Sequence, residues 1–180
     1  MDNRTFFTGR RDFLKKGSLA ALGLTVIPSL FNRVAASDRL RIAHIGLGGM
    51  GNNHMQWFNA LPEVDIVALC DVDKKHLRRT ARTLKDLGSR LKFDTYTDFR
   101  RILDRQDIDA ITCATPDHWH AQIATLAFQS GKDVYGEKPL SYDVAEGRMM
   151  MENMESNNRV FQLGTQIHAT DNYHRVVELI

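Results

Sequence analysis

Three glycines with the spacing Gly-x-Gly-x-x-Gly stand between a short apolar run, residues 41–45, and a helix-like segment, residues 52–60. In a strand–turn–helix context, the first glycine permits a tight turn, the second lets a pyrophosphate approach the backbone, and the third lets the helix pack closely on the strand. The free N–H groups at the helix start attract phosphates. The spacing therefore predicts a dinucleotide site. The loop residues predicted to bind the cofactor are Gly46, Leu47, Gly48, Gly49, Met50 and Gly51.

A carboxylate follows the second apolar run at the offset that such a site requires. Residues 64–70 are expected to form a buried strand, and Asp71 comes 20 positions after Gly51. A carboxylate about 20 residues beyond the glycines accepts hydrogen bonds from the adenosine ribose and repels a 2′-phosphate, so it favours NAD over NADP. Two alternatives stay open. Asp71 could instead cap the next helix, and Lys74 or Lys75 could hold a 2′-phosphate, which would make NADP the cofactor.

The elements that must position these groups alternate between strand and helix patterns over residues 38–166. This alternation predicts an α/β domain with a Rossmann-type doubly wound parallel sheet, covered by helices on both faces. The expected strands span residues 41–45, 64–70, 92–96, 108–114, 133–136 and 159–163. The expected helices span residues 52–60, 73–87, 98–103, 117–129 and 141–154, and Ser141 is the expected cap of the last one.

Ligands of such a sheet bind at the carboxyl ends of its strands. The segments that follow the later strands, residues 115–120, 137–139 and 164–166, are therefore expected to meet the glycine loop at one edge. Cys70 and Cys113 end two of the apolar runs and are expected to be small buried side chains. A disulfide is not expected, because in this fold the first strand separates the second from the fourth.

The first 36 residues resemble a twin-arginine (Tat) export signal rather than part of the fold. Arg10 and Arg11 precede a modestly apolar stretch that is too short for a confident membrane span, and small residues end at Ala36 as a cleavage site requires. A periplasmic protein without a membrane anchor is therefore predicted. The segment holds six of the 24 basic and two of the 22 acidic residues, which leaves 18 basic against 20 acidic. The remaining charge gives no reason to expect nucleic-acid binding.

Five motifs in a fixed order carry a resemblance that spans residues 39–180. They are Gly-Leu-Gly-Gly-Met-Gly at 46–51, Cys-Asp-Val-Asp at 70–73, Ala-Thr-Pro-Asp-His-Trp-His at 114–120, Gly-Glu-Lys-Pro at 136–139 and Leu-Gly-Thr-Gln at 163–166. This set resembles the nucleotide-binding half of the Gfo/Idh/MocA family, which includes glucose–fructose oxidoreductase and inositol dehydrogenase. The resemblance implies an NAD(P)-dependent oxidoreductase that transfers a hydride to or from a sugar- or polyol-type substrate.

The resemblance also implies roles for the loop after the fourth strand. Thr115, Pro116, Trp119 and His120 are expected to contact the cofactor near its nicotinamide end. The histidines of this loop, His118 and His120, could instead be ordinary polar groups at a helix start. A metal site is not predicted, because two histidines two positions apart are too few ligands for a tetrahedral site.

The Glu-Lys-Pro motif gives the expected catalytic residue, Lys138. In the family the matching lysine lies beside substrate and nicotinamide, where an ammonium can bind the reacting hydroxyl and stabilise alkoxide charge. Glu137 is expected to contact the ribose on the nicotinamide side, and the Lys138–Pro139 bond is expected to be cis. The alternative is an exposed ion pair between Glu137 and Lys138.

Full-length relatives carry a second, α+β domain that completes the substrate pocket and often mediates oligomerisation. Residues 167–180 are expected to begin the helix that connects to it, so the domain itself would be absent and this chain catalytically incomplete. The full-length protein is expected to form homo-oligomers. Two other functions stay open: a glycosidase or epimerase that uses bound NAD for transient oxidation, and a non-catalytic nucleotide-binding fragment.

Overall fold

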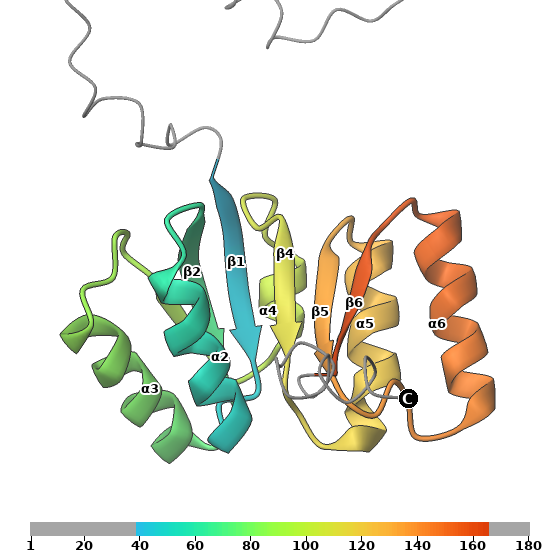
Figure 1. Ribbon diagram of the computed structural model, residues 1–180, viewed down its shortest axis with the longest axis horizontal. Coiled ribbons are helices and arrows are strands. Elements are labelled where there is room, and N and C mark those ends of the chain that lie inside the picture. Colours follow the sequence, from blue (N-terminus) through green and yellow to red (C-terminus); the bar gives the residue numbers. More distant parts are fainter. Residues whose placement is uncertain (1–38, 166–180) are drawn as a thin grey trace, which may run out of the picture. The chain divides into compact units, whose positions relative to one another are not determined.

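A computed structural model describes residues 39–165, which form a six-stranded sheet in the order β3-β2-β1-β4-β5-β6 (Figure 1). All neighbouring strands are parallel. The predicted Rossmann-type sheet is therefore confirmed. The predicted export signal and connecting helix lie outside the described residues. The strands are β1 (Leu40–Ile45), β2 (Val64–Cys70), β3 (Asp94–Tyr96), β4 (Ala110–Cys113), β5 (Asp133–Glu137) and β6 (Phe161–Gly164).

The helices cover the two faces of this sheet in separate groups (Figure 1). On the face of α2 and α3, Met55 and Leu77 pack against β1 and β2. On the opposite face, Ile123 and Phe128 of α5 belong to a second buried cluster. Burying one such side chain contributes roughly 1.5–3 kcal/mol. The helices are α2 (Gly49–Ala60), α3 (Lys74–Asp86), α4 (Arg100–Leu103), α5 (His120–Gln129) and α6 (Val144–Ser156), and a 3-10 turn, η3 (Asp117–Trp119), precedes α5.

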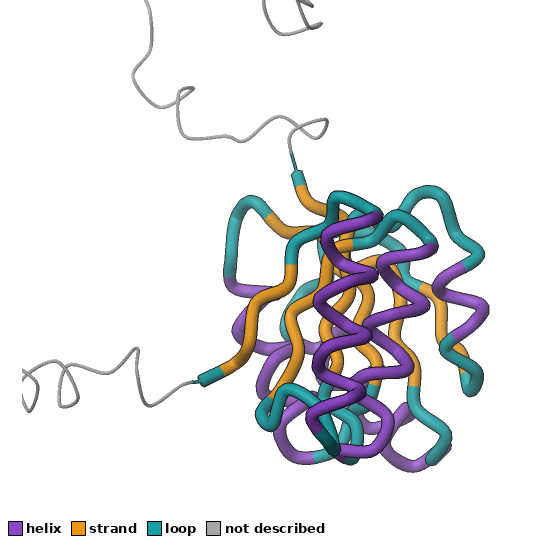
Figure 2. Tube along the Cα trace, turned by 90° about the vertical axis from the view of Figure 1, so that its right-hand side faces the viewer, coloured by secondary structure: helices purple, strands orange, loops and turns teal. Residues whose placement is uncertain are grey.

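Because every strand runs in the same direction, all six carboxyl ends meet at one edge, the lower edge in Figure 1. In the side view of Figure 2 the helices lie alongside the strands, as crossovers between parallel strands require. The loops that follow the strands are therefore neighbours in space although they are far apart in sequence. This edge is where the sequence predicts the functional groups.

The cap of α6 differs from the prediction. Asp143, in an extended conformation, accepts a hydrogen bond from the Glu146 N–H at 2.8 Å. The Glu146 carboxylate in turn accepts one from the Tyr142 N–H at 3.0 Å. The predicted cap, Ser141, is wrong: its hydroxyl donates to the Asp143 carbonyl at 2.7 Å. A carboxylate at this position also interacts favourably with the positive end of the helix.

Both cysteines are buried free thiols, Cys70 on β2 and Cys113 on β4. As predicted, β1 lies between these two strands. Burial raises the pKa of Cys70 to about 12 and that of Cys113 to about 11. Both side chains therefore serve as small apolar filler. Within residues 39–165, none of the helices has the length and apolar character needed to cross a membrane.

Candidate functional site

The glycine loop has the backbone geometry that its spacing predicts. Gly46 has φ +83°, and a Cβ there would lie 2.5 Å from the Ala114 carbonyl oxygen. A Cβ on Gly51 would lie only 1.8 Å from the Gly46 carbonyl oxygen, so this helix approaches the strand as closely as glycine allows. A Cβ on Gly48 would meet no atom within 4 Å. Gly48 is also the N-cap of α2, so the open space lies at the start of a helix that attracts phosphate.

Asp71 lies at the end of β2 and faces the glycine loop. Its Oδ2 accepts a hydrogen bond from the Leu47 N–H at 2.6 Å, and its Oδ1 accepts one from the Asp73 N–H at 2.7 Å. Asp73, not Asp71, caps α3, because its Oδ1 accepts from the Lys75 N–H at 2.6 Å. Each carboxylate oxygen has further lone-pair capacity. Asp71 can therefore fix the loop and still accept bonds from ribose hydroxyls.

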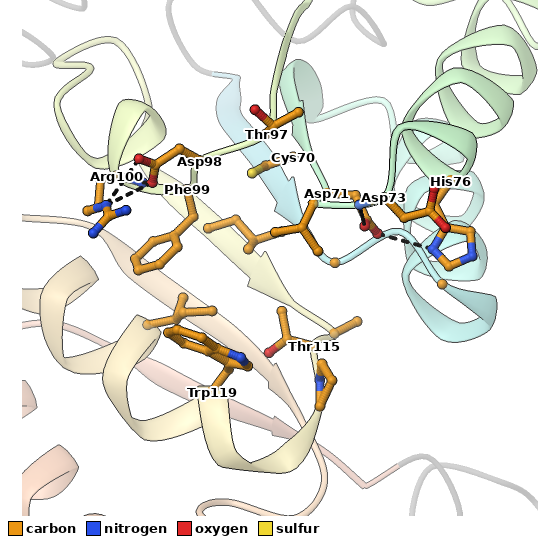
Figure 3. Close-up of a pocket in the computed structure, with 17 residues that line it drawn as sticks. Cys70, Asp71, Asp73, His76, Thr97, Asp98, Phe99, Arg100, Thr115 and Trp119 are labelled. Carbon is orange, nitrogen blue, oxygen red and sulfur yellow. Dashed lines mark hydrogen bonds and ion pairs between the residues drawn. The ribbon is translucent and has the colours of Figure 1, made fainter.

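A cavity of about 770 Å³ opens at the carboxyl edge of β1, β2, β3 and β4. Figure 3 shows its two contrasting ends: Asp71, Asp73 and His76 lie on one side, and Phe99 and Trp119 lie on the other. The Phe99 and Trp119 rings pack edge to face with centroids 6.3 Å apart. An aromatic end suits a base and a carboxylate suits a ribose. The cavity size is within the range of small-molecule and cofactor sites.

The structure brings part of the predicted set to this cavity. The predicted residues that line it are Gly46, Gly48, Asp71, Thr115, Pro116 and Trp119. Leu47 is instead fully buried in the core beneath α2, and Gly51 is buried against Gly46. Neither Lys74 nor Lys75 is among the lining residues; the side chain of α3 that reaches the cavity is His76, whose Nδ1 lies 3.5 Å from Asp71 Oδ2.

Sequence reasoning missed the opposite wall of the cavity. Thr97, Asp98, Phe99 and Arg100 line it between β3 and α4. The signal for them was weak, because β3 is only three residues long. Their position after a strand in a parallel sheet is the one feature that points to the site.

The Glu-Lys-Pro turn follows β5 at the same edge of the sheet. The predicted cis bond between Lys138 and Pro139 is confirmed. Lys138 is exposed and Glu137 is buried, and Glu137 Oε2 accepts a hydrogen bond from the Lys138 N–H at 3.3 Å. Glu137 Oε1 lies 2.8 Å from Nε2 of His54, a buried residue of α2. His54 is a second residue that sequence reasoning missed.

His120 is buried rather than exposed to the cavity. Its Nδ1 lies 2.7 Å from the Pro139 carbonyl oxygen, and its Nε2 lies 2.9 Å from the Thr115 carbonyl oxygen. The imidazole thus joins the loop after β4 to the turn after β5, and it does not line the cavity. His118 is exposed. Within residues 39–165 there is no group of three His, Cys, Asp or Glu side chains that could hold a metal ion.

Two histidines are fully buried, His54 on α2 and His44 on β1. Burial lowers the pKa of His54, against the opposing effect of the Glu137 carboxylate. The pKa of His44 is lowered to about 3, first by burial and then by the nearby His54. His44 Nδ1 contacts the Thr112 hydroxyl at 2.6 Å. Both imidazoles are therefore neutral at pH 7 and act as structural polar groups within the core.

The fold and the cavity together define a dinucleotide-binding domain. The site fits the cofactor on three counts: open space over Gly48 at a helix start, a carboxylate at Asp71, and an aromatic cavity wall. The chain belongs to the Gfo/Idh/MocA oxidoreductase family, whose model, described as an NAD-binding Rossmann fold, matches residues 40–165. NAD is accordingly its cofactor.

Two kinds of named protein are among the relatives that match this chain. Myo-inositol 2-dehydrogenase from Lactobacillus plantarum is 31% identical, with a TM-score of 0.69 over 78% of this chain and 40% of its own. Scyllo-inositol dehydrogenase from Lactobacillus casei, solved with NAD(H) and scyllo-inositol, is 26% identical with the same TM-score over 78% and 40%. A "Glycosyl hydrolase family 109 protein" of Shewanella pealeana is 30% identical, covering 83% of this chain and 38% of the relative. The chain thus spans about two fifths of these relatives.

Proposed function

We propose that this chain is the cofactor domain of an exported, NAD-dependent oxidoreductase that acts on a polyol or sugar-like substrate. The observation that carries the proposal is the shared edge of the sheet. The Asp71 carboxylate, the open glycine loop and the Glu137–Pro139 turn all follow strands that end there. Asp71 and the glycine loop would hold a cofactor at this edge, where the turn that carries Lys138 also lies.

The proposed reaction is oxidation of a secondary alcohol. When bound, NAD supplies the carbon that accepts a hydride from the substrate C–H. Lys138 holds the substrate hydroxyl through its ammonium group and stabilises the negative charge that develops as the hydroxyl proton passes to water. A carbonyl forms as the C–H bond gives up its hydride. The domain positions the cofactor and the substrate hydroxyl relative to each other, and such positioning supplies a large part of the rate enhancement of a bimolecular step.

The twin-arginine pattern in residues 1–36 supports export to the periplasm. Twin-arginine routes carry folded proteins, so the cofactor can be loaded before export. Free NAD is scarce outside the cytoplasm, so we propose that the cofactor is held tightly and is regenerated in place by a second substrate. We further propose that residues 167–180 lead into a substrate-binding domain and that the full-length protein is a homo-oligomer.

The proposal is tested on protein purified from the periplasm and expressed to its natural stop codon. Denaturation should release about one NAD(H) per chain, identified by mass. Added myo- or scyllo-inositol should raise the 340 nm absorbance by one equivalent per site and no further without an electron acceptor. Lys138→Met should keep the nucleotide and lose roughly 10²- to 10⁴-fold in rate, whereas Lys85→Met, at an exposed lysine of α3, should change neither. Absence of bound nucleotide would contradict the proposal.

A redox-neutral alternative is favoured by one observation, the likeness to proteins named glycosyl hydrolase family 109. In that case an aryl glycoside should release its phenol while the 340 nm signal rises only transiently. The Glu-Lys-Pro sequence at 137–139 favours the dehydrogenase, because the resemblance to dehydrogenases of the family rests partly on this motif. Bound nucleotide without any turnover of polyols or glycosides would instead support a non-catalytic module.

A further inference from the structure

Two buried imidazoles touch the residues on either side of Lys138. His54 comes from α2 and contacts the Glu137 side chain, and His120 comes from the start of α5 and contacts the Pro139 carbonyl. His54 is 0% exposed and His120 is 3% exposed. Lys138 itself is exposed, so its own side chain receives little support from packing. The position of its backbone therefore depends on the two neighbours that the histidines hold.

His54 is held in one orientation. Its ring lies 5.2 Å from the Tyr135 ring and 5.8 Å from the Trp57 ring, measured between centroids. A carboxylate oxygen accepts hydrogen bonds, and the ring can donate to Glu137 Oε1 from Nε2, 2.8 Å away. Burial lowers the pKa of His54 and favours the neutral ring, which leaves Nδ1 as an acceptor only. This contact joins β5 to the helix whose N-terminus faces the open space over Gly48.

His120 makes the second connection. Its two ring nitrogens lie 2.7 Å from the Pro139 carbonyl oxygen and 2.9 Å from the Thr115 carbonyl oxygen. Carbonyl oxygens only accept, so each contact is a hydrogen bond only when the facing ring nitrogen carries a proton, and both form together only when both nitrogens carry one. Thr115 lines the cavity. The turn that carries Lys138 is thus tied to a loop that faces the cofactor site.

We propose that His54 and His120 are positioning residues that set the location of Lys138 relative to the bound nucleotide. The inference rests on the proposed function of Lys138. Each histidine fixes one flank of the Glu137–Pro139 turn to a segment of the nucleotide site, α2 on one side and the β4 loop on the other. A displacement of about 1 Å at a reacting group can cost about 10²-fold in rate. Loss of either contact should therefore lower kcat while the Asp71 and glycine-loop contacts still retain the nucleotide.

The decisive comparison uses two variants of His120. The side-chain amide of Asn approximates the position of Nδ1, and that of Gln approximates Nε2. His120→Asn should keep the Pro139 contact and stay within about threefold of the wild-type kcat. His120→Gln keeps only the Thr115 contact and should lose about 10- to 100-fold in kcat with KM little changed. For His54, Gln should rescue the contact with Glu137, and Leu should not.

A second readout does not depend on knowing the substrate. In the full-length protein, bound NAD should protect Lys138 from acetylation by acetic anhydride, and the extent of acetylation is measured by peptide mass. His120→Gln and His54→Leu should lose this protection while their nucleotide content stays at the wild-type level. Equal protection in these variants and in wild type would overturn the positioning role alone. No protection in the wild type would overturn the proposed role of Lys138, and the positioning role with it.

Discussion

The buried histidine of β1 makes the stability of the domain depend on pH. His44 is fully buried, and its Nε2 has no hydrogen-bond partner among the described residues. Its pKa is lowered from 6.5 to about 3, chiefly because burial disfavours the charged ring. Below pH 6.5 the unfolded chain binds a proton at this position and the folded chain does not. The free energy of unfolding should therefore fall as the pH drops from about 6.5 toward 3.

The size of the effect follows from linkage. Each pH unit within this window costs about 1.4 kcal/mol for one such group, so His44 should remove roughly 2 kcal/mol between pH 7.5 and pH 5. The variant His44→Gln lacks the titrating group, and any packing defect that it introduces is independent of pH. Between pH 7.5 and pH 5, the free energy of unfolding of His44→Gln should fall by roughly 2 kcal/mol less than that of wild type. Some loss should remain, because the pKa of His54 is lowered as well.

The assay is urea unfolding of nucleotide-free protein, followed by far-UV circular dichroism at both pH values. His118→Gln is the matched control, because it removes an exposed histidine and should leave the wild-type pH dependence intact. If His44→Gln loses as much stability as wild type between the two pH values, His44 does not titrate as its burial requires, and the reasoning fails.

Three further predictions concern the site and the core. Gly51→Ala should cost about 3 kcal/mol or more of unfolding free energy in urea titrations, because its Cβ would lie 1.8 Å from the Gly46 carbonyl oxygen. The control is Gly49→Ala, whose stability should remain close to that of wild type because a Cβ at this position would meet no atom within 4 Å. Asp71→Asn should weaken NAD binding by about 1.5–3 kcal/mol in calorimetry, and it should also reduce the ratio of NAD affinity to NADP affinity. Unchanged NAD affinity would refute the assignment of Asp71 to the ribose. Cys113, whose pKa burial raises to about 11, should react with a thiol reagent only after urea unfolds the domain.

Most of the fold was predictable because it depends on local patterns. Apolar runs that alternate with segments of helical periodicity predict a parallel sheet. Because crossovers between parallel strands are right-handed, few strand orders are possible for such a sheet. The cap of α6 was not predictable in the same way. Ser141 and Asp143 are both good capping residues, and the choice depends on which backbone is extended where the chain leaves the sheet. At Asp143 the φ and ψ values of −142° and 174° meet that requirement.

The same distinction, between what local sequence patterns predict and what depends on tertiary packing, applies to the candidate site. The roles of Gly46, Gly51 and Asp71 follow from spacing within one strand–turn–helix–strand unit, and the structure gives each the expected geometry. The contact between His54 and Glu137 joins residues 83 positions apart, so no local pattern indicates it. The resemblance placed His120 at the cofactor, but burial between two loops gives it a different set of partners. Spacing identifies groups within one local unit of the chain, whereas tertiary packing decides which distant side chains support them.

The two candidate reactions of the full-length protein are compatible with one nucleotide domain. Net oxidation of a polyol and redox-neutral cleavage of a glycoside through transient oxidation both begin with the same step, removal of a hydride from a C–H bond beside a hydroxyl. The residues for that step, by our proposal, are the NAD site and Lys138. What separates the two outcomes is whether the reduced cofactor is re-oxidised by the same substrate molecule or by another. That choice depends on groups that hold the rest of the substrate, so Lys138 variants should impair either reaction to a similar degree.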